Sequence, residues 1–148
     1  GQSFARSWAG ELFSCVASQG GSMSLEGIRV LLVDDERRFV ETLAERLSMR
    51  GLVPRVAHDG PQALEAVTRP VDVIVLDLRM PGMDGFEVLR KVKASNPQVQ
   101  VIILTGHGGD SEEETAYRMG ACAFLRKPMD IDELLSTIRM ACHDRAKE

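Results

Sequence analysis

Five short apolar runs, each followed by a segment of helical periodicity, constrain the fold of this chain most. The run at residues 71–77, Val-Asp-Val-Ile-Val-Leu-Asp, is typical of a strand buried on both faces. The other runs lie at residues 28–33, 52–57, 99–104 and 121–125. In the segments between them, apolar residues recur every three to four positions. This alternation predicts an α/β fold: a five-stranded parallel sheet flanked by five helices and joined by right-handed crossovers.

Local signals predict where the elements begin and which strand lies at an edge. Pro54 inside the second strand has no N–H to donate to the ladder, which places this residue at a sheet edge or near a strand end. Pro61 suits the first turn of the second helix. Three pairs have the spacing of capping boxes for the later helices: Asp84 with Glu87, Ser111 with Glu114, and Asp130 with Glu133.

Composition excludes several classes of protein. With 148 residues, 44% of them hydrophobic and 27% charged, the chain suits one soluble globular domain. A net charge of -4 excludes the basic excess that direct nucleic-acid binding requires. The three cysteines show no Cys-x-x-Cys pairing, which argues against a disulfide framework or zinc site and fits a reducing cytoplasm. No apolar run approaches the roughly 18 residues of a membrane span.

The first 26 residues form an N-terminal extension whose nature stays open. A linker-like Gly-Gly-Ser precedes Met23, which could be a natural start, so the preceding residues suit a tag or fusion segment. They also suit an amphipathic helix that docks on something, because apolar residues recur at four-residue intervals: Phe4, Trp8 and Leu12. The domain itself is expected at residues 27–143, followed by a polar tail at 144–148.

Polar residues stand where the predicted strands end. They are Asp34 and Asp35 after the first strand, Asp77 after the third, Thr105 after the fourth and Lys127 after the fifth. Because parallel strands point the same way, these side chains converge at one edge of the sheet. Clustered carboxylates repel one another and call for a cation, and Mg²⁺ prefers such oxygen ligands. The pattern predicts that Asp77 is a carboxylate nucleophile that accepts a phosphoryl group, with lysine and threonine binding its oxygens.

In combination, these motifs resemble those of the receiver domain of two-component response regulators, over about residues 27–143. They occur in the family's order: Asp34-Asp35, Asp77-Leu78-Arg79-Met80-Pro81-Gly82-Met83-Asp84-Gly85, Leu104-Thr105-Gly106, and Phe124-Leu125-Arg126-Lys127-Pro128. The resemblance implies a flavodoxin-like, doubly wound fold with strand order 2-1-3-4-5.

The resemblance also implies the chemistry of the site. Asp77 would be phosphorylated by a histidine kinase or a histidine phosphotransfer protein. Asp35, Asp77 and the backbone carbonyl of Arg79 would bind Mg²⁺ directly, and Asp34 would act through water. Such a domain is a phosphoacceptor that assists its own phosphorylation and dephosphorylation, and it is not an enzyme in the usual sense. Its output would pass to a downstream effector domain or protein.

A switch is the second implication of the resemblance. Thr105 and Lys127 would bind the phosphoryl oxygens, and Phe124 would change rotamer as Thr105 moves toward them. This would alter the surface of the fourth helix, fifth strand and fifth helix, which is also a candidate homodimer interface. Arg79 and His107 stand two residues beyond the acceptor and the threonine, where they would tune the lifetime of the phosphoryl group. A cis bond is expected at Lys127-Pro128.

Each assignment has a plainer alternative. Asp34 and Asp35 could cap the first helix, Thr105 could end its strand, Lys127 could be a surface charge, and Phe124 could be a core residue. His107 could be merely solvated.

The same residues disfavour two other classes of protein. A haloacid-dehalogenase-type phosphatase would need Asp-x-Asp after the first strand, and the acidic Asp34-Asp35-Glu36 would repel the phosphate of a flavin. The remaining alternative is a pseudo-receiver that only binds other proteins, although the acceptor, the acids and the lysine are all present. With no effector domain after the fifth helix, the sequence fits a stand-alone receiver or a piece of a longer regulator or hybrid kinase.

Overall fold

The computed structural model describes residues 24–147. The two interpretations of the N-terminal extension, a tag or a docking helix, concern residues outside this range. Five parallel strands form one sheet in the order β2-β1-β3-β4-β5, which confirms the expected topology. The strands are β1 (Arg29–Val33), β2 (Val53–Ala57), β3 (Val73–Leu76), β4 (Gln100–Thr105) and β5 (Ala123–Arg126).

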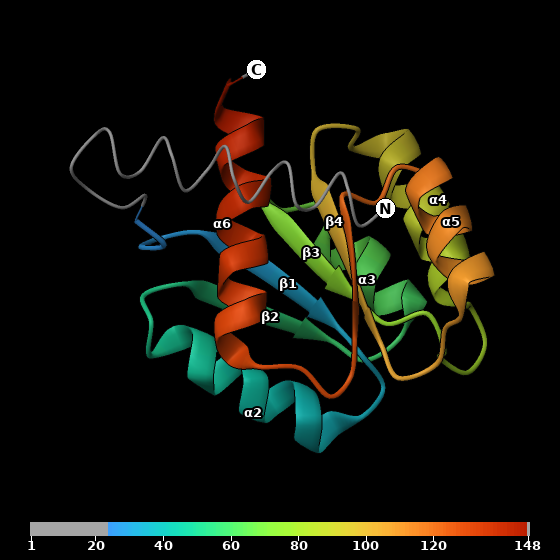
Figure 1. The fold of residues 1–148 in the computed structure, drawn as a ribbon, viewed down its shortest axis with the longest axis horizontal. Coiled ribbons are helices and arrows are strands. Elements are labelled where there is room, and N and C mark those ends of the chain that lie inside the picture. Colours follow the sequence, from blue (N-terminus) through green and yellow to red (C-terminus); the bar gives the residue numbers. More distant parts are fainter. Residues whose placement is uncertain (1–23, 148) are drawn as a thin grey trace.

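Five helices cover the two faces of the sheet (Figure 1). They are α2 (Arg37–Ser48), α3 (Gly60–Ala66), α4 (Gly85–Ser95), α5 (Asp110–Arg118) and α6 (Ile131–Lys147). Successive residues of β1 point to opposite faces of the sheet, and each face has its own apolar core. Leu31 packs with residues of α3, α4 and α5, whereas Leu32 packs with residues of α2 and α6. The sheet is therefore buried on both faces, as its continuous apolar strands predict.

The edge position of β2 is confirmed. This strand pairs only with β1 in the described sheet, with Pro54 opposite Val30. A proline at an edge removes no hydrogen bond from the interior of the ladder. The interior strands β1 and β3 pair without interruption from Val30 and Val73 to Val33 and Leu76. This pairing supports the carboxyl end of the sheet, where the polar residues follow the strands.

Two helix starts follow the sequence signals. The Asp84 carboxylate accepts a hydrogen bond from the Glu87 N–H at 3.0 Å, which confirms Asp84 as the cap of α4. Pro61 lies in the first turn of α3, as expected, and Asp59 caps that helix by accepting from the Gln62 N–H. The last helix, α6, begins directly after Asp130.

The predicted cap of α5 is wrong. Ser111 with Glu114 was expected to begin this helix, but the helix begins at Asp110 with Gly109 as its N-cap. The Gly109 N–H donates to the Glu112 carboxylate at 2.8 Å. Glu112 stands three residues after Gly109, so it can reach back to that N–H and shift the start of the helix by two residues.

Gly85 brings the start of α4 against the loop that follows β3. A Cβ at this position would lie 2.6 Å from Leu78 Cα and closer still to the Asp77 carbonyl oxygen. The Gly85 N–H donates to the Leu78 carbonyl at 2.9 Å. Because only glycine fits this close approach, the backbone immediately after Asp77 is held by α4.

Within residues 24–147, no helix is both long enough and apolar enough to cross a bilayer.

Candidate functional site

The two buried acids of the site lie side by side because their strands are neighbours. Val33 of β1 is in register with Leu76 of β3, so Asp34 and Asp77 follow at the same edge. Each residue is only 4% exposed. The Asp77 N–H donates to the Val33 carbonyl at 3.0 Å, which continues the pairing beyond the strand. The convergence predicted for these two carboxylates is therefore present.

The Lys127 side chain reaches these acids from β5, which forms the sheet edge opposite to β2. Lys127 follows β5, and its peptide bond to Pro128 is cis, as expected. Its Nζ donates to Asp34 Oδ2 at 2.7 Å and lies 4.0 Å from Asp77 Oδ2. The side chain is 13% exposed, so Lys127 is a site residue here rather than the solvated surface charge considered above.

Glu36, for which no role in the site was predicted, joins Asp34 and Asp77 in a group of three carboxylates. Oxygens of Asp34, Glu36 and Asp77 all lie within 4.8 Å of one another. Asp35, expected to bind the cation directly, has an exposed side chain and is not in this group. Hard carboxylate oxygens at this spacing could hold a divalent cation such as Mg²⁺.

A local turn explains how Glu36 enters the site. The Glu36 N–H donates to Asp34 Oδ1 at 2.9 Å, a turn typical of aspartate followed two residues later by a backbone donor. Glu36 Oε1 then accepts from Lys127 Nζ at 2.9 Å. The Asp-x-Glu spacing was a usable signal, but the sequence analysis counted Glu36 only as a negative charge. The Phe39 ring of α2 also packs against Lys127, with Nζ 4.3 Å from the ring centroid.

Burial and ion pairing set the charge state of the group. Burial raises the pKa of the Asp34 carboxyl, and the hydrogen bond from Lys127 offsets this only in part. Burial opposes the charge of Lys127, but its hydrogen bonds to Asp34 and Glu36 outweigh this and raise the pKa of the lysine. Lys127 lowers the pKa of Glu36. The lysine is therefore a permanent positive charge among carboxylates.

Thr105 lies at the end of β4 and is fully buried. Its hydroxyl donates to the His107 carbonyl and accepts from the His107 N–H, both at 3.1 Å. Both of these partners belong to a residue two positions away in the chain. The structure thus places Thr105 at the same edge of the sheet as Asp77, with its hydroxyl engaged in its own loop.

Phe124 lies on β5 next to this loop and is 8% exposed. A Cβ on Gly108 would lie 2.9 Å from Phe124 Cζ and 3.3 Å from Thr105 Cγ2, so ring, threonine and loop are in close packing. The Arg126 guanidinium lies 5.1 Å from the Phe124 ring centroid and donates to the Gly108 carbonyl at 3.2 Å. The aromatic side chain is a core residue that also contacts the threonine loop.

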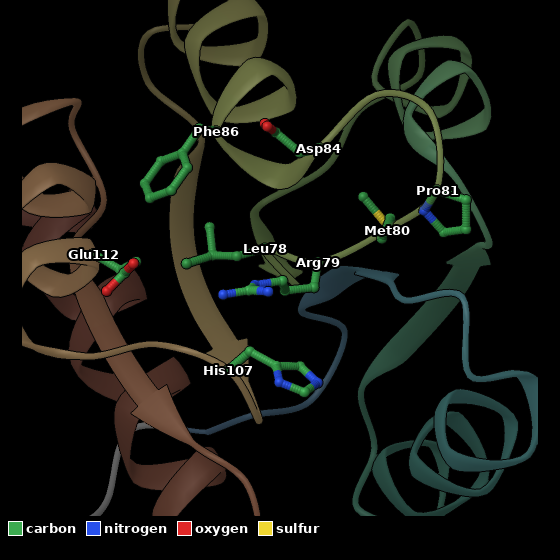
Figure 2. Close-up of a pocket in the computed structure, with 8 residues that line it drawn as sticks. All are labelled: Leu78, Arg79, Met80, Pro81, Asp84, Phe86, His107 and Glu112. Carbon is green, nitrogen blue, oxygen red and sulfur yellow. The ribbon is translucent and has the colours of Figure 1, made fainter.

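A cavity of about 490 Å³ opens beside the loop that follows Asp77 (Figure 2). Arg79 and His107 both line it, and the Arg79 side chain points across it toward Glu112. Hydrogen bonding from the Gly109 N–H lowers the pKa of Glu112, and the Arg79 charge adds to this. The Arg79 N–H lies 3.4 Å from Asp77 Oδ1. The two residues expected to tune the phosphoryl group therefore share one cavity beside the loop that follows Asp77.

Comparison with solved structures supports this architecture. The chain is similar to a CheY-like response regulator receiver domain from Methanospirillum hungatei JF-1, with a TM-score of 0.79 and 24% identity over 82% of this chain and 98% of that one. This match shows the fold. A receiver domain from Clostridium thermocellum matches with a TM-score of 0.77 and 30% identity, covering 81% of this chain and 98% of that one.

Sequence comparison gives the family. Residues 30–139 match the family model for the response regulator receiver domain. The response regulator MprA of Mycobacterium ulcerans is 39% identical over 114 residues, which are 76% of this chain and 49% of that protein. MprA of Mycobacterium leprae is 39% identical over 113 residues, with 76% and 50% covered. The chain thus spans about half the length of these curated relatives. It belongs to the receiver-domain family of two-component response regulators.

Proposed function

We propose that this chain is a phosphorylatable receiver in which Asp77 accepts a phosphoryl group from a histidine kinase or a histidine phosphotransfer protein. The observation that carries the proposal is the pairing of two buried acids, Asp34 and Asp77, with Lys127 Nζ, which lies 2.7 Å from one and 4.0 Å from the other. A carboxylate nucleophile needs a neighbouring cation to accept an anionic group. The family assignment supports the same role.

The transfer step uses the chain's own groups in stated roles. An Asp77 carboxylate oxygen attacks phosphorus, the P–N bond of the phosphohistidine breaks, and the leaving imidazole nitrogen keeps the electron pair. Lys127 then binds a phosphoryl oxygen, and the Thr105 hydroxyl leaves its bonds with His107 to bind another. Hydrolysis by water returns Asp77 to a carboxylate and releases phosphate.

The acidic group suits the Mg²⁺ that the resemblance implies. We assign direct binding to Asp35, Asp77 and the Arg79 carbonyl, and binding through water to Asp34. The fit rests on Asp34, Glu36 and Asp77, which present hard oxygens within 4.8 Å of one another, and the exposed Asp35 side chain would have to turn inward to join them. When bound, the cation supplies positive charge that offsets the charge of the phosphoryl oxygens.

The output surface in this proposal is formed by α5, β5 and α6. Phe124 changes rotamer as Thr105 moves, and the altered surface contacts an effector or a second copy of the chain. Arg79 and His107, which line the cavity beside the loop that follows Asp77, adjust how long the phosphoryl group survives. We assign the domain to residues 27–143, with residues 1–26 and 144–148 as flanks, and the reaction to the cytoplasm.

A single substitution tests the acceptor. Wild-type protein treated with a small phosphodonor and Mg²⁺ should gain the mass of one phosphoryl group in intact-mass spectrometry, and chelation of the cation should prevent this. Asp77→Asn should abolish the gain, because the amide is not a nucleophile. Asp132→Asn, an exposed acid on α6, is the matched control and should be labelled like wild type.

Two outcomes would contradict the proposal. Unchanged labelling of Asp77→Asn would show that another residue is the acceptor. Absence of labelling in the wild type, with both the donor and a histidine phosphotransfer protein, would favour the pseudo-receiver alternative.

A further inference from the structure

Glu36 is the second close partner of Lys127. Its Oε1 lies 2.9 Å from Lys127 Nζ, and Asp34 Oδ2 lies 2.7 Å from the same nitrogen. The Asp77 oxygen is the most distant of the three, at 4.0 Å. The ammonium group therefore lies toward the acids that follow β1 and away from the nucleophile.

The two close partners of Lys127 differ in how firmly they hold it. The Asp34 side chain is 5% exposed, whereas the Glu36 side chain is 64% exposed. An exposed ion pair is screened by water and salt and contributes little free energy, so it can break and reform readily. Lys127 must move from at least one close partner to contact a phosphoryl oxygen on Asp77. Glu36 is the partner that can release it at low cost.

We propose that Glu36 is a positioning residue for phosphoryl transfer, which holds Lys127 beside Asp34 and releases it to the phosphoryl group on Asp77. The inference rests on the proposed function, because it needs Asp77 to be the acceptor. Glu36 acts through Lys127 and does not itself touch the transferred group. Its backbone turn onto Asp34 keeps the carboxylate at the site even though the side chain is exposed.

The substitution Glu36→Gln should accelerate transfer. Lys127 then has one competing partner fewer, so its ammonium group moves to a phosphoryl oxygen on Asp77 at lower cost. With phosphoramidate as donor, the P–N bond breaks and the nitrogen leaves as ammonia while the bond from Asp77 to phosphorus forms. At saturating Mg²⁺ the rate of labelling should rise about two- to fivefold, the range that an exposed ion pair supports.

A double-mutant cycle separates positioning from a general charge effect. In the Lys127→Gln background, Glu36→Gln should no longer change the rate, because the group through which it acts is gone. Glu36→Asp keeps the charge but shortens the side chain by one methylene, so it should resemble Glu36→Gln. Glu41→Gln, an exposed acid on α2, is the control for charge and should match wild type.

The outcomes distinguish this inference from the proposed function. If wild type is labelled and Glu36→Gln is labelled at the same rate, the positioning role is wrong and the acceptor role stands. If Glu36→Asp behaves like wild type, or if the acceleration persists without Lys127, Glu36 acts by charge alone and the inference fails. If wild type is not labelled at all, both are wrong.

Discussion

The two halves of the site are held by contacts of different kinds. We call Asp34, Glu36, Asp77 and Lys127 the acid end, and Thr105, Phe124 and Arg126, with loop 106–109, the switch end. At the acid end, Lys127 bonds to Asp34 across 93 positions of the chain, and both side chains are largely buried. At the switch end, Thr105 bonds to a residue two positions away, and Arg126 pairs with an Asp110 side chain that is fully exposed. A buried ion pair between residues far apart in the sequence thus holds the acid end, whereas the switch end is held by hydrogen bonds within one loop and by ion pairs that are partly exposed and contribute little free energy.

Breaking the acid end should have the largest effect on stability. Removing one partner of a buried pair costs about 3–5 kcal/mol, but Asp34 can take up a proton, so Lys127→Met should lower the free energy of unfolding by about 2 kcal/mol. The raised pKa of Asp34 supports this adjustment. Urea unfolding followed by circular dichroism would measure the loss. Lys91→Met removes an exposed pair with Glu87 and should cost under about 0.5 kcal/mol. If both variants lost the same free energy of unfolding, the buried pair of Lys127 would be no more stabilising than the exposed pair of Lys91.

Crowding the switch end should cost less and spare the acid end. In Gly108→Ala the new Cβ would lie 2.9 Å from Phe124 Cζ, and the tip of the ring can shift, so we expect a loss of about 1 kcal/mol. Labelling of Asp77 should stay within about twofold of wild type, because no acid-end contact changes. Gly106→Ala meets nothing closer than 3.9 Å and is the matched control. A large drop in labelling would show that the two ends are not independent.

Removing the surface ion pairs of the switch end should have a smaller effect. Arg126 pairs with Glu113 at 3.1 Å and Asp110 at 3.6 Å. Arg126→Met should therefore lower the free energy of unfolding by about 0.5–1 kcal/mol at low salt, and high salt should erase most of the difference. Thermal unfolding at two salt concentrations would measure this. A loss that persists at high salt would mean that packing on the Phe124 ring, rather than charge, holds the guanidinium.

The smallest effect concerns the one tyrosine of the chain, which reports on the switch end. Burial raises the pKa of the Tyr117 phenol above its ordinary value of about 10, and the charge of Glu113 adds to this. The stability that this group contributes is fully present below its unfolded pKa and is lost as the pH rises through the folded pKa. An absorbance titration of tyrosinate should show the raised pKa, and Glu113→Gln should lower it. Glu114→Gln, whose partner is Arg118, should leave it unchanged.

The sequence allowed the core of the site to be predicted because strand ends in a parallel sheet must converge. Asp34, Asp77 and Lys127 meet for that reason alone. The predicted start of α5 was wrong because Gly109 with Glu112 and Ser111 with Glu114 have the same three-residue spacing, which gave no basis for choosing between them. In the structure Glu112 accepts from the Gly109 N–H, and Glu114 pairs with Arg118 instead.

The contacts of Glu36 and Phe39 with Lys127 were not predicted, because neither residue stands at a strand end. They depend on how the lysine side chain crosses the sheet and on the turn that folds Glu36 back onto Asp34. These are tertiary contacts of side chains, and a pattern of apolar periodicity carries no information about them.

Because Lys127 lies 93 positions after Asp34 in the sequence, the site forms only when the last strand of the sheet has folded. A chain that has formed β1 and β3 but not β5 would bring Asp34 and Asp77 together without their ammonium group, and the carboxylates would repel. Closing a loop of this length also costs more entropy than closing a short one. The last strand to be added along the sequence therefore supplies the charge that the first one needs. In the function proposed above, competence to accept a phosphoryl group is then a property of the finished fold, and partly folded molecules would not be phosphorylated.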